Sequence, residues 1–582
     1  NVISTLPGYE EATQDVFASY LDAAAKFCEN ELAPINRAAD EEGCSFNPAD
    51  HSVTTPAGFK EAYQQYCELG FTGLDCDPAY GGQGMPKVLA FPMMEMQCSA
   101  NVAWSMYPGL SHGAYAAIHA HGTDEQKPTY LPKLVDGSWT GTMCLTEPHC
   151  GTDLGLLKTK AEPNGDGSYS ITGTKIFISA GEHDMSDNII HLVLARLPDS
   201  PKDVKGISLF IVPKFLIDEG AGADSIGERN DVAIAGLNHK MGQRGVTNTV
   251  LNFGDTQFNP GGENGAVGYL VGEPHRGIVY MFQMMNEARM AVGMGAVALG
   301  YTGYLKSVQY ARERPQGRPL DVKDPTTPQV PIVEHPDVRR MLLAQKAYVE
   351  GGMALGLYCA RLVDLQHSAE SDDESDAAGL LVDILTPIAK SWPSQWCLEA
   401  NNLAIQVHGG YGYTREYDVE QHYRDNRLNP IHEGTNGIQS LDLLGRKVTQ
   451  RGGASLAALG QVIAETVAAA GALGGEAAEL ASALDASWQR LVTVTAGMFG
   501  SGDIPAVMAN SHVYLEAFGH VVVAWLWLEQ FVAAAGKDGD FYDGKRQAAR
   551  YFFRFELPKT APQLDLLESL DRTTLEMRDG WF

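Results

Sequence analysis

Glycine-rich segments at the ends of predicted helices are the clearest places where this chain could approach a ligand closely. His408-Gly409-Gly410-Tyr411-Gly412 follows a long stretch with helical spacing. Glycine has no Cβ, so its backbone can lie directly against a ligand, although the same residues also suit the turn that ends a helix. No G-x-G-x-x-G follows a predicted strand, and G-x-x-x-x-G-K-[ST] is absent. A dinucleotide, if one binds, is therefore not held by a Rossmann or P-loop device.

Two other groups of reactive side chains are better explained without a metal ion. His149 and Cys150 are adjacent, but no second pair of ligands has the spacing of a metal site. The acidic run of residues 370–376 joins two helical stretches and predicts a solvated loop. We therefore expect no metal site.

Composition limits the classes of partner. The 582 residues carry a formal net charge of −29, which disfavours nucleic acid or an anionic membrane as the main partner. A local arginine cluster could still bind a small anion. No window reaches the 18 or so apolar residues of a membrane span. Nine cysteines without C-x-x-C indicate neither a disulfide framework nor structural zinc, and they predict a reducing cytoplasm.

Hydrophobic patterning divides the chain into four parts and predicts the α+β class. Helical spacing dominates residues 1–138. Short β-branched runs separated by turn signals predict a central, mostly antiparallel β domain over residues 139–260. Helical spacing returns over residues 261–447, which predicts a helical bundle. An alanine-rich helical extension follows over residues 448–582.

Five segments, taken in order, resemble the acyl-CoA dehydrogenase family over roughly residues 1 to 447. They are Met143 to Pro148 with Gly151-Thr152-Asp153, Lys175 to Gly181, Arg312 to Gly317, Gln406 to Gly412, and Arg424-Asp425 through Glu433-Gly434-Thr435-Asn436. Length and the C-terminal extension resemble the longer bacterial branch that includes 3-methylmercaptopropionyl-CoA dehydrogenases. The implied fold is an N-terminal helical domain, a β domain and a helical bundle that carries the catalytic base.

The resemblance implies FAD-dependent α,β-dehydrogenation of a fatty acyl-CoA, or of a methylmercaptopropionyl-like thioester, with Glu433 as the base. In this family the base removes the α-proton while the β-hydrogen leaves as hydride to the flavin. A carboxylate in a dry pocket has the raised proton affinity that this chemistry needs. Gly434 would allow a tight turn beside the substrate, and Arg289 matches an arginine that lines the active site. Thr152 and His432 would contact the substrate, and His432 replaces the tyrosine of many relatives.

The same resemblance assigns cofactor contacts. Those to the isoalloxazine ring would come from Leu145, Thr146, Phe177 and Ser179, and Phe177 departs from the family's common tryptophan. The phosphate and partner-subunit contacts would come from Arg314, Gln406, Gly409, Gly410 and Thr435. Gly437 replaces a common glutamine. The assignment implies a homodimer or a larger homo-oligomer.

Electrons would pass to an electron-transfer flavoprotein. An acyl-CoA oxidase would share the fold and the base, so sequence leaves that alternative open. A DNA-binding flavoprotein of the same fold would need a basic face, whereas residues 446–582 hold 12 Lys+Arg and 16 Asp+Glu. A non-catalytic acyl-CoA-binding module would not need the Glu433 motif. We therefore expect an enzyme that does not bind nucleic acid.

Overall fold

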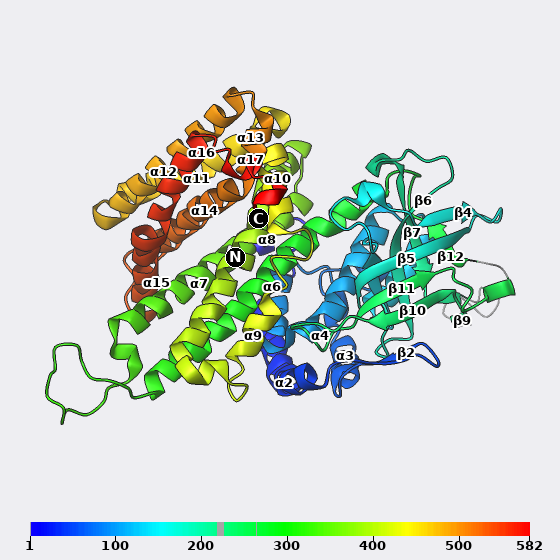
Figure 1. Cartoon of the computed structure of the whole chain (residues 1–582), viewed down its shortest axis with the longest axis horizontal. Coiled ribbons are helices and arrows are strands. Elements are labelled where there is room, and N and C mark those ends of the chain that lie inside the picture. Colours follow the sequence, from blue (N-terminus) through cyan, green and yellow to red (C-terminus); the bar gives the residue numbers. More distant parts are fainter. Residues whose placement is uncertain (1, 218–225, 263–264) are drawn as a thin grey trace. The chain divides into compact units, whose positions relative to one another are not determined.

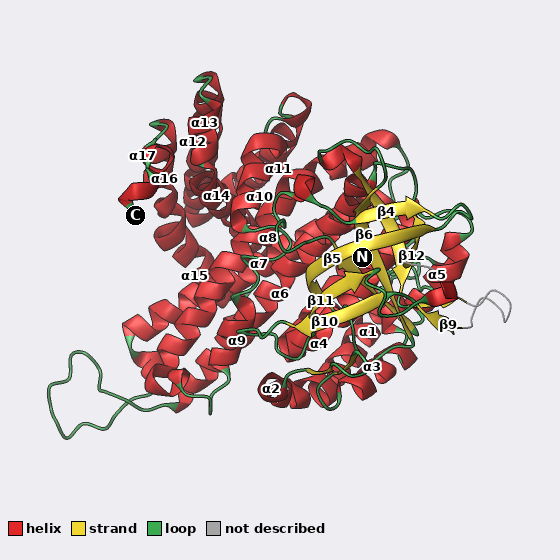
Figure 2. Cartoon of the chain, turned by 45° about the vertical axis from the view of Figure 1, so that its right-hand side comes forward, coloured by secondary structure: helices red, strands yellow, loops and turns green. Residues whose placement is uncertain are grey.

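The computed structural model describes residues 2–217, 226–262 and 265–582, which form two compact units, Asn1–Ala288 and Arg289–Phe582 (Figure 1). Helix α6 (Gly277–Glu313) begins in the first unit and ends in the second. The first unit contains helices and the main sheet, and the described residues of the second unit are helices and loops (Figure 2).

The helices of the first unit precede its sheet and enclose an aromatic core. They are α1 (Gln14–Phe27), α2 (Ala33–Glu42), α3 (Phe59–Glu68), α4 (Lys87–His121) and α5 (Gln126–Val135). Trp104 is fully buried, and its indole N–H donates to the carbonyl of Phe59 at 3.1 Å. Helix α4 lies directly on the sheet at Gly141, where a Cβ would come within 2.3 Å of the Cβ of Ala114. A larger residue at position 141 would force the helix away from the sheet.

An eight-stranded sheet forms the rest of the first unit, in the order β10-β11-β5-β12-β7-β6-β3, with β4 paired to β5 and β6. Its strands are β3 (Trp139–Cys144), β4 (Lys160–Pro163), β5 (Tyr169–Ser179), β6 (Asn188–Arg196), β7 (Ile207–Pro213), β10 (Val232–Leu237), β11 (Asn248–Phe253) and β12 (Ala266–Leu270). The pairings are antiparallel except those of β6 with β3 and with the end of β4. The prediction of a mostly antiparallel β domain between helical regions is confirmed.

Close approach of long helices defines the first half of the second unit. Helix α6 packs with α7 (Pro336–His367) and α8 (Asp372–His408), and the chain continues through α9 (Val419–Asn426) and α10 (Asn436–Asp442). A Cβ on Gly293 of α6 would lie only 1.8 Å from the carbonyl oxygen of Ala389 on α8. Glycine at this position therefore lets the two backbones touch, next to Lys390.

The acidic run of residues 370–376 is not a loop along its whole length, so that prediction was wrong. Helix α8 begins at Asp372, and the Ser371 hydroxyl accepts a hydrogen bond from the backbone N–H of Glu374 at 3.3 Å. The acidic side chains occupy the first turn, where the helix dipole favours negative charge. Most of the acidic run thus belongs to the first turn of α8, which Ser371 caps.

The C-terminal extension packs on the helices of its own unit. It comprises α11 (Ala454–Leu473), α12 (Gly475–Gly500), α13 (Ile504–Ala509), α14 (Ser511–Ala533), α15 (Asp540–Tyr551), α16 (Thr560–Glu568) and α17 (Thr573–Glu576). Helix α14 is almost wholly buried and contacts α7, α8 and α10 (Figure 1). The indole N–H of Trp527 donates to the carbonyl of Ala347 at 3.0 Å, and Gly351 leaves space for that ring.

One helical stretch in the described residues, Gln450–Leu473, is long and apolar enough to cross a membrane by length and composition alone. The sequence rule used above missed it because that rule asked for an unbroken apolar run. Its mean hydropathy is 1.6, and 22% of its most apolar window is buried. Helix α11 contacts α8, α12 and α14, so part of this surface packs within the second unit.

We expect the extension to be required for folding of the second unit. Replacing Trp527 by Ala should lower the free energy of unfolding by about 3–5 kcal/mol, because it leaves a cavity between α14 and α7. The same change at exposed Trp581, which is 62% accessible, is the matched control and should cost less than about 0.5 kcal/mol. Urea denaturation followed by circular dichroism measures both.

A chain that ends at Lys447 provides a second test of the same expectation. It exposes the apolar surfaces of α7 and α8 that α14 covers, so it should aggregate and lose FAD. A shortened chain that stays soluble, keeps its oligomeric state and remains fully active would show that the extension serves a partner outside this chain.

Candidate active site

Glu433 lies in a tight turn between α9 and α10, and the backbone of the turn is left-handed at two successive residues. The φ angles are 52° at Glu433 and 84° at Gly434. The side-chain amide of Gln439 donates to the carbonyl oxygens of Glu433 at 3.1 Å and of Gly434 at 3.4 Å. A non-glycine residue adopts this conformation only where its surroundings enforce it, which is common at functional sites. The cap of α10 is Thr435, whose hydroxyl accepts from the backbone N–H of Ile438.

The surroundings of Glu433 favour a carboxyl group that holds its proton tightly. Burial raises the pKa of Glu433, and the positive charges of Arg289 and Lys390 oppose that rise without cancelling it. Arg289 is buried, and its Nη1 donates to Oδ2 of Asp442 at 3.0 Å. Because Asp442 already neutralises Arg289, desolvation prevails at Glu433. The result is a carboxylate with the properties of a general base.

A chain of side-chain amides fixes the orientation of His432. Its Nε2 lies 2.9 Å from Oδ1 of Asn429, whose Nδ2 donates to Oδ1 of Asn426 at 2.8 Å. Asn426 donates in turn to Asn401 at 2.7 Å, and Asn401 donates to the carbonyl of Leu299 at 2.8 Å. Since every amide in the chain donates away from His432, the imidazole must donate through Nε2. Burial lowers the pKa of His432 to about 3, so the ring is neutral at physiological pH.

Sequence reasoning missed Lys390, which lies in the middle of α8. Its side chain is fully buried, and burial lowers its pKa to about 7 while Glu433 opposes the shift. The available signal was a lysine within the otherwise uncharged stretch from Ile384 to Trp392. An ionisable residue on the buried face of a helix is a reasonable candidate for function.

In the first unit, the residues expected to contact the isoalloxazine ring lie on adjoining segments. The backbone N–H of Ile176 donates to the carbonyl of Thr146 at 2.9 Å, which joins β5 to the segment after β3. Phe177 has a φ of 60°, and its side chain is 63% exposed although it lies within a strand. An exposed aromatic ring in a left-handed conformation is suited to covering the face of a flat ligand. Ser179 is half-buried at the end of the same strand.

A buried ion pair anchors this segment. Nζ of Lys175 donates to Oε1 of Glu147 at 2.9 Å and to the carbonyl of Leu145 at 3.0 Å. The same carboxylate accepts from the backbone N–H groups of Lys158 and Thr159 and from the Thr159 hydroxyl. Burial raises the pKa of Glu147, but Lys175 and these donors outweigh that effect and hold it below its usual value. Oxygen atoms of Glu147 lie near His149 and Cys150, yet these bonds already satisfy the carboxylate.

A separate exposed patch in the second unit brings Arg314 to the glycine-rich segment. The Arg314 guanidinium lies 5.6 Å from the ring centroid of Tyr411. Gly409 and Gly410 are exposed, and a Cβ on either would meet open space. Gln406 is also exposed, one turn earlier on α8. A cation beside accessible backbone is suited to binding phosphate.

Thr152 lies in an exposed part of the segment between β3 and β4. The ring-contact residues and Thr152 belong to the first unit, whereas Glu433, Arg289, His432 and the Arg314 patch belong to the second. Within the second unit the structure brings Glu433, Arg289, His432 and Lys390 together.

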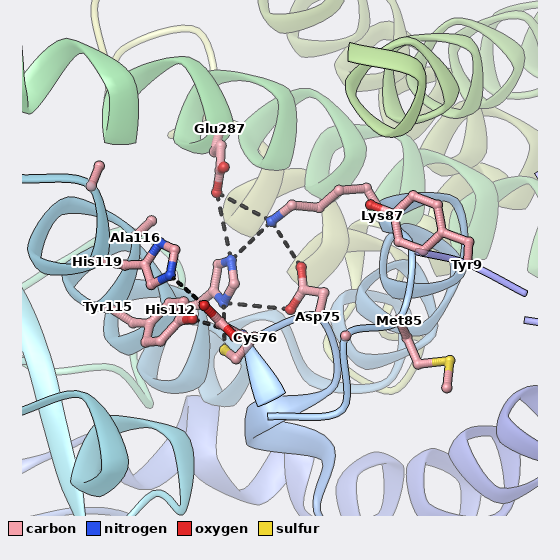
Figure 3. Close-up of a pocket in the computed structure, with 13 residues that line it drawn as sticks. Tyr9, Asp75, Cys76, Met85, Lys87, His112, Tyr115, Ala116, His119 and Glu287 are labelled. Carbon is pink, nitrogen blue, oxygen red and sulfur yellow. Dashed lines mark hydrogen bonds and ion pairs between the residues drawn. The ribbon is translucent and has the colours of Figure 1, made fainter. Parts of the chain in front are cut away.

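A polar cavity of about 220 Å³ in the first unit contains a different set of charged side chains (Figure 3). Nζ of Lys87 lies 2.8 Å from Asp75, 3.3 Å from Glu287 and 2.9 Å from Nε2 of His112. Ligand atoms of Asp75, Cys76 and His112 lie within 4.8 Å of one another, close enough to hold a metal ion. The Lys87 ammonium already supplies the positive charge between the two carboxylates, so we assign this cluster a structural role.

Comparison with known proteins identifies the family. Residues 18–138, 142–256 and 275–448 match the N-terminal, middle and C-terminal domains of acyl-CoA dehydrogenase, and residues 459–578 match an "Acetyl-CoA dehydrogenase C-terminal like" domain. The chain is 38% identical to 3-methylmercaptopropionyl-CoA dehydrogenase of Ruegeria pomeroyi, with 94% of this chain and 92% of that protein aligned. The chain belongs to the acyl-CoA dehydrogenase family. It is also 36% identical to a broad-specificity linear acyl-CoA dehydrogenase of Mycobacterium tuberculosis, over 99% of this chain and 95% of the relative.

Solved structures agree on the fold. An acyl-CoA dehydrogenase from Bacillus anthracis, complexed with FAD, superposes with a TM-score of 0.69 over 96% of each chain, at 21% identity. The family is FAD-dependent, which confirms the predicted cofactor and the oxidoreductase class. The residues present suit FAD, because exposed Phe177 offers a ring face and Arg314 beside open glycine backbone offers a phosphate site.

We expect the Glu147–Lys175 pair to stabilise the cofactor-binding unit. Replacing Lys175 by Met should lower the free energy of unfolding by about 3–5 kcal/mol at pH 7, because a buried carboxylate loses its counter-ion. Lys160, exposed on β4, provides the matched control as Lys160→Met. Urea denaturation of the holoenzyme at pH 7 and at pH 4 measures the effect.

The pH dependence of the free energy of unfolding distinguishes the effect of the lost ion pair in Lys175→Met from the effect of altered packing. The depressed pKa of Glu147 makes the pair stabilising above the unfolded value of about 4.3, and this contribution is lost as pH falls through the folded value. In Lys175→Met the unpaired carboxyl group prefers its proton, so the deficit relative to wild type should shrink at pH 4. An equal deficit at both pH values would mean that the ion pair is not the source of the stability.

Proposed function

We propose that the protein catalyses FAD-dependent α,β-dehydrogenation of an acyl-CoA thioester to the trans-2-enoyl-CoA, with Glu433 as the base. The observation that carries this proposal is the raised pKa of Glu433 in a strained turn beside two buried cations. A surface carboxylate or a helix cap would need neither feature, and the cap of α10 is Thr435.

In the proposed reaction the Cα–H bond breaks and its proton moves to the carboxylate of Glu433. FAD, when bound, supplies the acceptor for the hydride that leaves Cβ with its electron pair, and the carbon–carbon double bond forms. The backbone N–H of Glu433 would donate to the thioester carbonyl, where negative charge develops. Gly434 allows the left-handed turn that presents this N–H, and Arg289, paired with Asp442, would line the site beside the base.

Leu145, Thr146, Phe177 and Ser179 would hold the isoalloxazine ring, and Thr435 would meet the phosphates. We further propose that Arg314, Gln406, Gly409 and Gly410 serve the FAD of a partner subunit in a homodimer or larger oligomer. The position of Arg314 supports the sharing, because it directly follows the last residue of α6, and the stretch from Arg289 to Arg314 spans about 37 Å at the helical rise. That distance is far longer than the ribityl chain between the ring and the pyrophosphate of one FAD.

The substrate is proposed to be a linear fatty acyl-CoA or a 3-methylmercaptopropionyl-CoA-like thioester, as the names of the relatives suggest. Thr152 and His432 would line the acyl-CoA site. The neutral His432 ring suits an uncharged acyl chain. Steady-state assays over a series of acyl-CoA thioesters, including the methylthio compound, would identify the preferred one.

Electrons are proposed to leave through an electron-transfer flavoprotein, and the enzyme is proposed to act in fatty acid β-oxidation in the cytoplasm. All nine cysteines lie in the described residues and are free, which is in keeping with a reducing compartment. An acyl-CoA oxidase is the alternative with the same base. Rapid reoxidation of the reduced enzyme by air, at the rate seen with the flavoprotein, would favour the oxidase.

Replacing Glu433 by Gln should leave FAD content and acyl-CoA binding intact and slow flavin bleaching by substrate by several orders of magnitude. An amide cannot accept the α-proton. Anaerobic stopped-flow absorbance measures the bleaching. Glu479→Gln, at an exposed position of α12, is the matched control and should bleach at the wild-type rate. Near-normal bleaching in Glu433→Gln would place the base elsewhere.

Replacing Arg314 by Ala should reduce FAD retention during gel filtration more than it reduces the bleaching rate per bound flavin. The guanidinium offers charge-assisted, fork-like hydrogen bonds to a pyrophosphate. Arg312→Ala, at an exposed position two residues earlier, is the control. Unchanged FAD content in Arg314→Ala, or a monomeric holoenzyme by light scattering at micromolar concentration, would contradict the shared-site proposal.

A further inference from the structure

Lys390 is a fully buried lysine whose charge has no direct partner. Among the described residues, no acceptor is within hydrogen-bonding distance of its Nζ. Burying an ammonium group without an acceptor is costly, because its hydration is lost and nothing replaces it. Lysines are rarely buried completely unless they are paired. The position of Lys390 therefore needs an explanation beyond packing.

The charged and titratable groups that face Lys390 come from α6 and from the turn after α9. Arg289 of α6 is the neighbouring cation, and Asp442 neutralises it through the 3.0 Å hydrogen bond. His432 is near enough for Lys390 to affect its titration, but its ring is neutral. Glu433 is the carboxylate that acts on Lys390. Glu433 and Lys390 thus interact electrostatically, without a direct hydrogen bond.

Packing keeps the amine in this position. The contact between Gly293 and the carbonyl of Ala389 holds α8 against α6 at the residue before Lys390. On another face of α8, Trp392 packs against His520 of α14, with ring centroids 6.0 Å apart. The side chain of Lys390 is therefore enclosed within the bundle, where Glu433 and Arg289 act on it.

Resting on the function proposed above, we propose that Lys390 is a positioning residue for the dehydrogenation, which acts through Glu433. Its buried amine sets how strongly the Glu433 carboxylate binds the α-proton. A protonated amine stabilises the carboxylate and makes it a weaker base. A neutral amine leaves desolvation unopposed at that side of the site and makes Glu433 a stronger base.

Lys390 changes its charge state near neutral pH. Burial lowers its pKa to about 7, so both charge states are populated near neutral pH. As pH rises through this value, the amine loses its charge and the proton affinity of Glu433 rises. Glu433 is then ionised and strongly basic at the same time, which is the combination that proton abstraction needs.

Two substitutions fix the two charge states of Lys390 separately. Lys390→Met removes the charge at nearly the same length, and Lys390→Arg makes the charge permanent. Anaerobic flavin bleaching by saturating acyl-CoA is measured from pH 5.5 to pH 9.5 in the holoenzyme. Lys323→Met, at an exposed loop position, is the control.

We expect the acid limb of the bleaching profile to move up by about one pH unit in Lys390→Met and to stay in place in Lys390→Arg, because below its own pKa Lys390 carries the same charge as arginine. Above that pKa the plateau rate should match the wild type in the Met variant and fall a few-fold in the Arg variant, because the wild-type amine is neutral there. A merely structural role would not divide the effects of the two variants between the two limbs in this way. Since arginine could fail to fit, FAD content is checked for both variants, and the Met variant alone suffices for the test.

Profiles for a folded Lys390→Met that overlay the wild type would overturn this proposal while leaving Glu433 as the base, provided that Glu433→Gln is inactive. An active Glu433→Gln enzyme would instead overturn the proposed function itself. The two failures are thus distinguishable in one set of measurements.

Discussion

The constraint on which the second unit depends is the need to keep a carboxyl group poorly solvated while leaving it open to substrate. Burial raises the proton affinity of Glu433, and any unneutralised cation nearby would cancel that gain. The structure meets the constraint by pairing Arg289 with Asp442 and by burying Lys390, which lowers the pKa of its amine to about 7 and so reduces its positive charge near neutral pH. Among the described residues, neither of these two side chains forms a direct salt bridge with the base.

Fixing such a carboxylate requires a backbone that cannot relax. The left-handed turn at Glu433 and Gly434 is held by Gln439 from one side and by the amide chain from His432 to Asn401 from the other. That chain ends on the carbonyl of Leu299 in α6, so the turn is attached to the same helix that carries Arg289. The close contact at Gly293 then sets the spacing of α6 and α8 around the base.

The sequence predicted the α–β–α order and the α+β class because the spacing of apolar residues along a helix or a strand depends only on which residues are buried. The family motifs also predict which residues contact FAD, and this stays a prediction; Phe177 and Arg314 are exposed and thus accessible to a ligand. The start of α8 was misplaced because negative charge in a first helical turn looks like a solvated loop. The sequence could indicate a buried lysine at position 390, but neither the neighbours of Lys390 nor the amide chain could be predicted, since hydrogen bonds and charge pairing between distant residues depend on three-dimensional packing.

The C-terminal extension covers the helices that surround the base. Helices α7 and α8 are nearly apolar on the face that α14 covers, and the rings of Trp392, Trp396, His520 and Phe552 pack against one another there. A bundle without this cover would have to bury that face against another subunit. Because α14 fills it from within the chain, α8 is packed against α14 on one face and against α6 at Ala389, the residue before Lys390. The extension thus supports the helix that carries Lys390.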